Sequence, residues 1–131
     1  MIENLSKEQL AGIFEALPVD ISFVDETETV RFWNKHETRI FKRPHAALGK
    51  TVQQCHPPKS VDKVNQVIAD LKSGRRESAD FWIDLKGRKV YIRYFGVKDK
   101  NGRYLGTLEV SQDITDIKKI EGEKRLLEYL S

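Results

Sequence analysis

The sequence predicts an α+β fold: a five-stranded antiparallel sheet with helices on one face and a further helix at each end of the chain. Two observations support this fold class. Short segments rich in β-branched and aromatic residues have the composition of strands, at 20–25, 29–34, 77–85, 90–97 and 103–112. Two longer segments, 5–17 and 61–71, repeat apolar residues at helical spacing.

The first segment, 5–17, predicts an amphipathic helix. Ser6 and Gln9 have the spacing of a capping box, and Pro18 ends the helix because the residue before a proline disfavours the helical region. Residues 1–18 therefore form either a cap packed on the sheet or a dimerisation helix. The residues that share its apolar face are Leu10, Ile13, Phe14 and Leu17.

The middle of the chain connects two strands to a longer helix. Residues 36–42 predict a short helical turn, and 51–60 is irregular around Cys55-His56-Pro57-Pro58. Ser60 is the expected N-cap of the helix at 61–71. The apolar stripe of that helix has spacings of three and four: Val61, Val64, Ile68 and Leu71.

Turn signals separate the last three strands. Lys86-Gly87 joins the third strand to the fourth, and Asn101-Gly102 predicts a hairpin because both residues tolerate positive φ. The fifth strand passes into Asp113-Ile114-Thr115. Thr115 is the expected N-cap of a C-terminal helix over 116–131.

The composition narrows the class of protein. A chain of 131 residues fits one domain, and a net charge of +3 from 23 basic and 20 acidic side chains is too small and too interleaved for nucleic-acid binding. No apolar run is long enough for a membrane span, and no signal peptide is expected. With Cys55 as the only cysteine, we expect a cytoplasmic protein. Phosphate-loop, nucleophile-elbow and His-Glu-x-x-His motifs are missing, so we expect no enzyme.

Three places in the chain resemble the PAS domain superfamily. They are Asn34 at the end of the second strand, the glycine-led 49–52 segment, and the Asp113-Ile114-Thr115 exit. The segments 54–60, 108–115 and 121–127 resemble a bacterial and archaeal PAS group often found after a hemerythrin-like region. The resemblance implies a sensor domain over 19–115 and a signalling helix over 116–131, acting on a downstream signalling protein or domain.

His56 is the first candidate site residue, because two successive prolines stiffen the chain beside it. It either shapes the loop by bonding to backbone, contacts a ligand, or ligates haem iron. PAS haem sensors place their histidine in the longer helix, and 61–71 contains none; the flavin-binding cysteine motif is also missing. The histidine and cysteine spacings match no zinc motif, so no metal site is predicted. The candidate cofactor-binding residues are His56, Cys55, Asn34, Arg93, Phe95 and Ser111.

The sequence leaves open which face of the sheet lines a cavity, because side chains alternate along a strand. On the fourth strand the choice is between Tyr91, Arg93 and Phe95, and Ile92 and Tyr94. On the fifth strand it is between Leu108 and Val110, and Glu109 and Ser111. If Arg93 and Glu109 both face inward, they are expected to pair, and an inward arginine suits a carboxylate ligand.

The function predicted from these features is a homodimeric sensory module. A small molecule, cofactor or redox change near His56 shifts the sheet, and the junction at Asp113, Ile114 and Thr115 passes the change to the terminal helix. The alternative is a ligand-free protein–protein interaction module that acts in dimerisation. The two hypotheses differ in whether the domain binds a small-molecule ligand.

Overall fold

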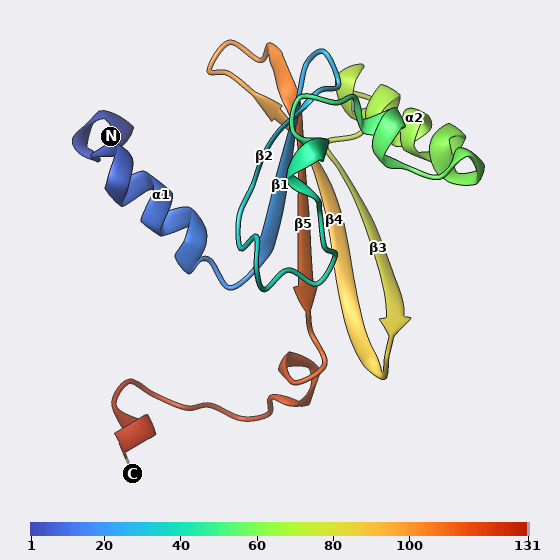
Figure 1. Cartoon of the computed structure of the whole chain (residues 1–131). Helices are drawn as coiled ribbons and strands as arrows, with labels where there is room; N and C mark the ends of the chain where they lie inside the picture. Colours follow the sequence, from blue (N-terminus) through green and yellow to red (C-terminus); the bar gives the residue numbers. More distant parts are fainter. Residues whose placement is uncertain (131) are drawn as a thin grey trace.

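The computed structural model, which describes residues 1–130, has one five-stranded antiparallel sheet with the order β2-β1-β5-β4-β3 (Figure 1). The predicted α+β class and all predicted strands are confirmed, with ends that move by one or two residues. The strands are β1 (Asp20–Asp25), β2 (Val30–Trp33), β3 (Ser78–Leu85), β4 (Arg88–Lys98) and β5 (Tyr104–Asp113).

The two predicted hairpin turns differ in kind. Lys86 and Gly87 both have positive φ, 51° and 78°, and join β3 to β4 by a two-residue turn. At Asn101-Gly102 only Gly102 has a positive φ, of 83°. There the Oδ1 of Asp99 accepts the backbone N–H groups of Asn101 and Arg103, each at 2.9 Å, so a side chain holds this longer turn.

Helix α2 (Pro58–Lys72) covers one face of the sheet by packing on β4 and β5 (Figure 1). It begins at Pro58, so the predicted Ser60 cap is wrong. The Ser60 hydroxyl instead donates to the Pro57 carbonyl oxygen at 3.1 Å, and proline in the first turn needs no hydrogen-bond partner for its nitrogen. Ile68 and Leu71 of the predicted stripe are buried.

Helix α1 (Lys7–Ala16) has the predicted capping box but packs differently from a cap on the sheet. It projects from the sheet in Figure 1, and none of its residues is buried. The ring of Phe14 lies 5.2 Å from that of Phe32, and Asn34 Nδ2 donates to the Phe14 carbonyl oxygen at 2.7 Å. Lys35 adds two bonds at 2.9 Å, from its backbone N–H to the Glu15 carboxylate and from Nζ to the Glu15 carbonyl oxygen.

The segment between β2 and α2 keeps only a hydrogen-bonded turn at 36–38 of the predicted helical turn at 36–42. It forms irregular chain and the short 3-10 helices η2 (His45–Ala47) and η3 (Val52–Cys55). Arg39, only 3% exposed, explains the departure. Its guanidinium donates to the carbonyl oxygens of Phe41, Ile21 and Asn34, and these bonds hold the backbone in a non-helical path.

The chain after β5 also differs from the prediction of a helix over 116–131. Its described part, to residue 130, contains only two short 3-10 helices, η4 (Ile117–Lys119) and η5 (Glu128–Leu130), and it runs away from the sheet (Figure 1). The apolar residues that repeat at partial heptad spacing in this segment, Ile117, Ile120, Leu127 and Leu130, are all exposed and have nothing to pack against. A helix this short is marginal without such packing. Ser131, the end of the predicted helix, lies outside the described residues.

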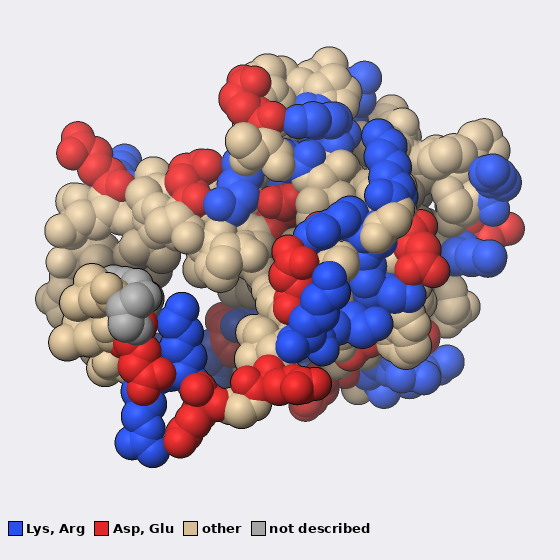
Figure 2. All heavy atoms as spheres, turned by 90° about the horizontal axis from the view of Figure 1, so that it is seen from below, with Lys and Arg blue, Asp and Glu red and all other residues tan. Residues whose placement is uncertain are grey.

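Charged side chains of both signs share the lower face of the molecule. Figure 2 shows basic groups gathered near its middle with acidic groups beside them. Around the β3–β4 turn, Arg88 pairs with Asp113 and Asp116, and Lys89 pairs with Asp84. Over residues 1–130, no helix combines the length and apolarity needed to cross a bilayer.

Candidate functional site

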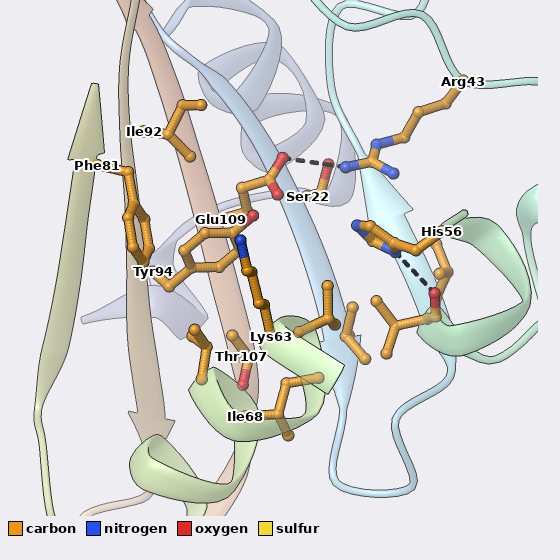
Figure 3. Close-up of a pocket in the computed structure, with 15 residues that line it drawn as sticks. Ser22, Arg43, His56, Lys63, Ile68, Phe81, Ile92, Tyr94, Thr107 and Glu109 are labelled. Carbon is orange, nitrogen blue, oxygen red and sulfur yellow. Dashed lines mark hydrogen bonds and ion pairs between the residues drawn. The ribbon is translucent and has the colours of Figure 1, made fainter. Parts of the chain in front are cut away.

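A cavity of about 230 Å³ lies between α2, the face of the sheet on which α2 packs, and the loop before α2 (Figure 3). Its wall is mainly aliphatic and aromatic, with a few polar groups that converge on it. This composition is typical of small-molecule sites, although the volume is below the range of about 300–1,000 Å³ for drug-sized ligands. The apolar lining residues are Val24, Val30, Val52, Val64, Val67, Ile68, Phe81 and Ile92.

Strand register decides which face lines the cavity. Tyr94 pairs with Glu109, and Arg93 pairs with Val110, so the two pairs lie on opposite faces. Ile92, Tyr94 and Glu109 line the cavity. The candidates Arg93 and Phe95 therefore point to the other face, so the condition for an Arg93–Glu109 pair, that both face inward, is not met.

Arg43 takes the place that Arg93 was expected to fill. Its Nη2 lies 3.0 Å from Glu109 Oε1, with side chains 18% and 14% exposed, and its Nε has no hydrogen-bond partner among the described residues. Burial raises the pKa of Tyr94 far above its usual range, and the Glu109 carboxylate raises it further. The cavity thus holds a neutral phenol beside a half-satisfied ion pair.

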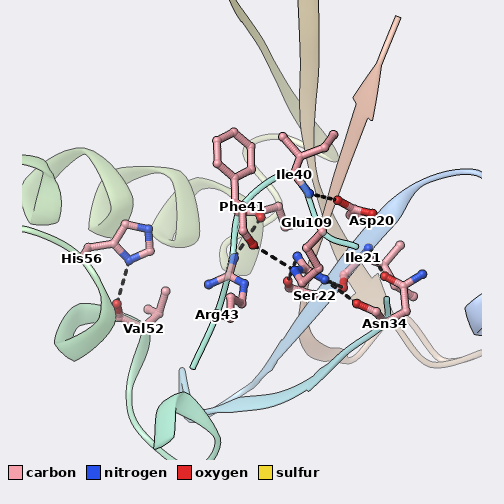
Figure 4. Close-up of polar contacts among 11 residues, drawn as sticks. Asp20, Ile21, Ser22, Asn34, Ile40, Phe41, Arg43, Val52, His56 and Glu109 are labelled. Carbon is pink, nitrogen blue, oxygen red and sulfur yellow. Dashed lines mark hydrogen bonds and ion pairs between the residues drawn. The ribbon is translucent and has the colours of Figure 1, made fainter. Parts of the chain in front are cut away.

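His56 lines the cavity and is bonded to the backbone. Its Nδ1 lies 2.8 Å from the Val52 carbonyl oxygen (Figure 4). Because a carbonyl oxygen only accepts, Nδ1 donates to it, and Nε2 is the ring nitrogen left for a ligand. This geometry combines the backbone-bonded interpretation of His56 with the ligand-contact interpretation.

Lys63 reaches the cavity from α2. Figure 3 shows its side chain directed toward Glu109, and it makes no ion pair or hydrogen bond within residues 1–130. The sequence prediction overlooked it, although a position four residues before Val67 lies on the same side of the helix. Arg43 gave no such signal, because it stands in an irregular polar stretch.

A buried polar network supports the cavity from behind (Figure 4). Arg39 Nη2 donates to Ser22 Oγ at 3.0 Å, and Ser22 lines the cavity. Asn34 Oδ1 accepts the N–H of Ile21 at 2.7 Å, and Asp20 Oδ2 accepts that of Ile40 at 2.7 Å. The candidate Asn34 therefore ties β1 to β2 and α1, and lies outside the cavity lining.

The two remaining candidates, the partly buried Cys55 and the buried Ser111, do not line the cavity. Cys55 packs against the cluster of Val30, Trp33 and Ala47. Ser111 is 1% exposed, and its Oγ has no partner among the described residues.

Asp113 and Thr115 lock the end of β5 to the start of β4. Asp113 Oδ2 accepts from Arg88 Nε at 2.7 Å, and its Oδ1 accepts the backbone N–H and hydroxyl of Thr115. Thr115 Oγ1 accepts the N–H of Lys89 at 2.8 Å, so Thr115 is no helix cap. The N–H of Ile114 donates to the Lys89 carbonyl oxygen at 2.9 Å. The Arg88 contact, followed by the Thr115 bonds, lowers the pKa of Asp113 to about 2.

Comparison with known proteins identifies the class. The PAS domain family matches residues 10–115. The C-terminal domain of a Streptococcus mutans protein is 34% identical, with a TM-score of 0.85 over 89% of this chain and 91% of that chain. The chain belongs to the PAS domain family, whose members generally act as sensory or interaction modules. The narrower group that follows a hemerythrin-like region stays a prediction.

More distant solved structures share the fold. A sensory box sensor histidine kinase from Vibrio cholerae is 15% identical, with a TM-score of 0.57 over 81% of this chain and 90% of that chain. The Vibrio cholerae VqmA dimer is 19% identical, with a TM-score of 0.62 over 93% of this chain and 58% of that chain. VqmA has also been solved bound to DPO. Comparison with curated proteins gives no significant match.

Proposed function

We propose that this PAS domain is a sensory module that binds a small molecule in the cavity and relays the change through β5. The observation that carries the proposal is the mainly apolar cavity of about 230 Å³, into which Arg43, Glu109 and His56 converge. VqmA, a protein of the same fold, is bound to DPO, which supports the view that this fold accommodates small molecules.

The path of the relay follows from the position of Glu109. This residue lies in β5, four residues before Asp113, and its carboxylate is tied to Arg43 in the loop before α2. A ligand that competes for Arg43 would release Glu109 and so favour a different position of β5 relative to the loop before α2. The Arg88–Asp113–Thr115 contacts then respond at the exit. Such a shift requires that the ligand bind one state more tightly than the other.

The cavity size limits the class of ligand. Drug-sized ligands occupy cavities of about 300–1,000 Å³, and haem is at least that large. This cavity, of about 230 Å³, is too small for haem and fits a smaller molecule. The Nε2 nitrogen of His56 is left for a hydrogen-bonding group of a smaller molecule.

The relay can be tested by titrating the ¹⁵N-labelled chain with a library of small fragments and following the amide chemical shifts by nuclear magnetic resonance. A fragment that shifts the Val64 and Thr107 amides should also shift the Ile114 amide. The Asp113→Asn variant should keep the cavity shifts and lose those at Ile114. Asp99→Asn, which alters another turn-holding carboxylate, is the matched control and should behave as the wild type.

Two results would contradict the proposal in different ways. Shifts that stay within the cavity in the wild type would disprove the relay. If no fragment shifts a cavity amide, the second candidate function, a ligand-free interaction module, is favoured.

The observation behind that candidate is α1, which buries no residue and exposes Ile13 at 46%. Sedimentation velocity would then show a dimer that forms without any ligand.

A further inference from the structure

Several hydrogen-bond donors at the cavity wall have no acceptor among the described residues. Ser22 Oγ accepts from Arg39, so its own proton remains available to a ligand. The Arg43 guanidinium has five donors; one contacts Glu109, and Nε has no partner within the described chain. Lys63 adds an ammonium group that is free of partners over residues 1–130.

The charges follow the same pattern as the donors. Arg43 and Lys63 are cationic, and Glu109 is the one carboxylate among the described residues that line the cavity. The Arg39 guanidinium behind the wall is already occupied by three carbonyl oxygens and Ser22. The cavity lining therefore carries one more positive than negative charge, and an anionic ligand would balance it.

The rest of the wall is apolar. Aliphatic side chains of β1, η3 and α2 face the ring of Phe81 and the side chain of Ile92 across the cavity (Figure 3). Such a wall stabilises a hydrocarbon body by removing it from water. It offers few partners for the hydroxyl groups of a sugar.

We propose that the ligand is a small monocarboxylate with an apolar body, held with its carboxylate between Arg43 and Lys63. This inference rests on the proposed function and names the ligand class of the same cavity. The carboxylate supplies the missing acceptors and the missing negative charge together, and charge-assisted bonds to a guanidinium are the stronger kind. The Ser22 hydroxyl is a further donor to the same head group.

Isothermal titration calorimetry on the full chain tests the ligand class with matched pairs. The probes are phenylacetate against phenylacetamide, and 4-methylpentanoate against 4-methylpentanamide. Each acid has the shape of its amide but differs in charge. We expect at least one acid to bind with one-to-one stoichiometry and about tenfold more tightly than its amide, since a lost charge-assisted contact costs on that order.

Three variants locate the binding. Arg43→Met and Lys63→Met should each weaken binding of the acid about five- to tenfold. Lys59→Met is the matched control: Lys59 is an exposed lysine of the same helix outside the cavity lining, and its variant should bind as the wild type. Lys63 is exposed, so Lys63→Met keeps the test valid if Arg43→Met fails to fold.

The outcomes separate this inference from the proposed function. If an amide binds as tightly as its acid, or if Lys63→Met and Arg43→Met both bind the acid normally, the carboxylate class is wrong while small-molecule binding stands. If neither acids nor amides bind, the inference is wrong, and the fragment screen alone decides whether the cavity takes any ligand.

Discussion

The two faces of the sheet each hold an arginine whose Nε is buried without a partner in the described structure. On the cavity face, Arg43 meets the carboxylate of Glu109. On the opposite face, Arg93 lies over the rings of Tyr91 and Phe95, 4.9 and 5.7 Å from their centroids. The same side chain therefore serves charge recognition on one face and aromatic stacking on the other.

The difference arises from what covers each face. Helix α2 and the loop before it stand off the cavity face and leave a space among them. On the opposite face Ile21 and Val110 are buried, whereas Trp82, which pairs with Tyr91, is 65% exposed. A face with a space can exchange partners with a ligand, whereas the buried part of the other face contributes to stability.

The largest expected contrast comes from two glycines. A Cβ at Gly106, on the outer face with φ 155°, would lie 2.2 Å from the Val24 carbonyl oxygen and 2.6 Å from the Phe23 ring. At Gly96, on the cavity face, it would meet Leu71 no closer than 3.4 Å. We expect Gly106→Ala to lower the free energy of unfolding by about 3 kcal/mol or more. Gly96→Ala should stay within about 1 kcal/mol of the wild type in urea unfolding. If the two variants lowered the free energy of unfolding equally, the close packing around Gly106 would be contradicted.

A smaller contrast is expected between the arginines. Arg43→Met leaves the half-buried Glu109 without its partner and should destabilise the chain by about 2 kcal/mol. Arg93→Met keeps an apolar stem against the rings and should cost about 0.5 kcal/mol. The Arg43→Met/Glu109→Leu double variant should recover most of the loss, because no charge is left buried. Urea unfolding of the four proteins measures this, and failure of the double variant to recover would show that packing dominates at Arg43.

The smallest effect is expected at the exposed end of β5, where Asp113 pairs with Arg88 in contact with solvent. The pKa of Asp113, lowered to about 2 by Arg88 and Thr115, lies below its unfolded value. The pair therefore stabilises the fold above about pH 4, and this contribution is lost as the pH falls toward about 2. We expect the melting temperature of the wild type to exceed that of Asp113→Asn at about pH 6, with the two converging near pH 2. A gap that is constant with pH would mean that the ion pair contributes nothing.

The sequence by itself predicted the α+β class, the strands, the Ser6–Gln9 capping box and the Asp113–Thr115 exit. These features depend on residues close together in the chain: alternation within a strand, a side chain bonding three residues away, a turn glycine. His56 was also predicted at the cavity, because the two prolines beside it are a local signal. The cap at Ser60 and the terminal helix were wrong, and the turn at 36–42 forms only over 36–38. Proline, the lack of a packing partner and the buried Arg39 overrode local preference at these three places.

Only the tertiary structure decided which side chains share the cavity. Strand register placed Glu109 inside and Arg93 outside, and a shift of one residue would have exchanged them. Arg43, Lys63 and Glu109 come from a loop, a helix and a strand that meet only in the fold. Periodicity fixes a side chain relative to its own element, but the partners that give it a chemical role lie far away in sequence, and packing brings them together.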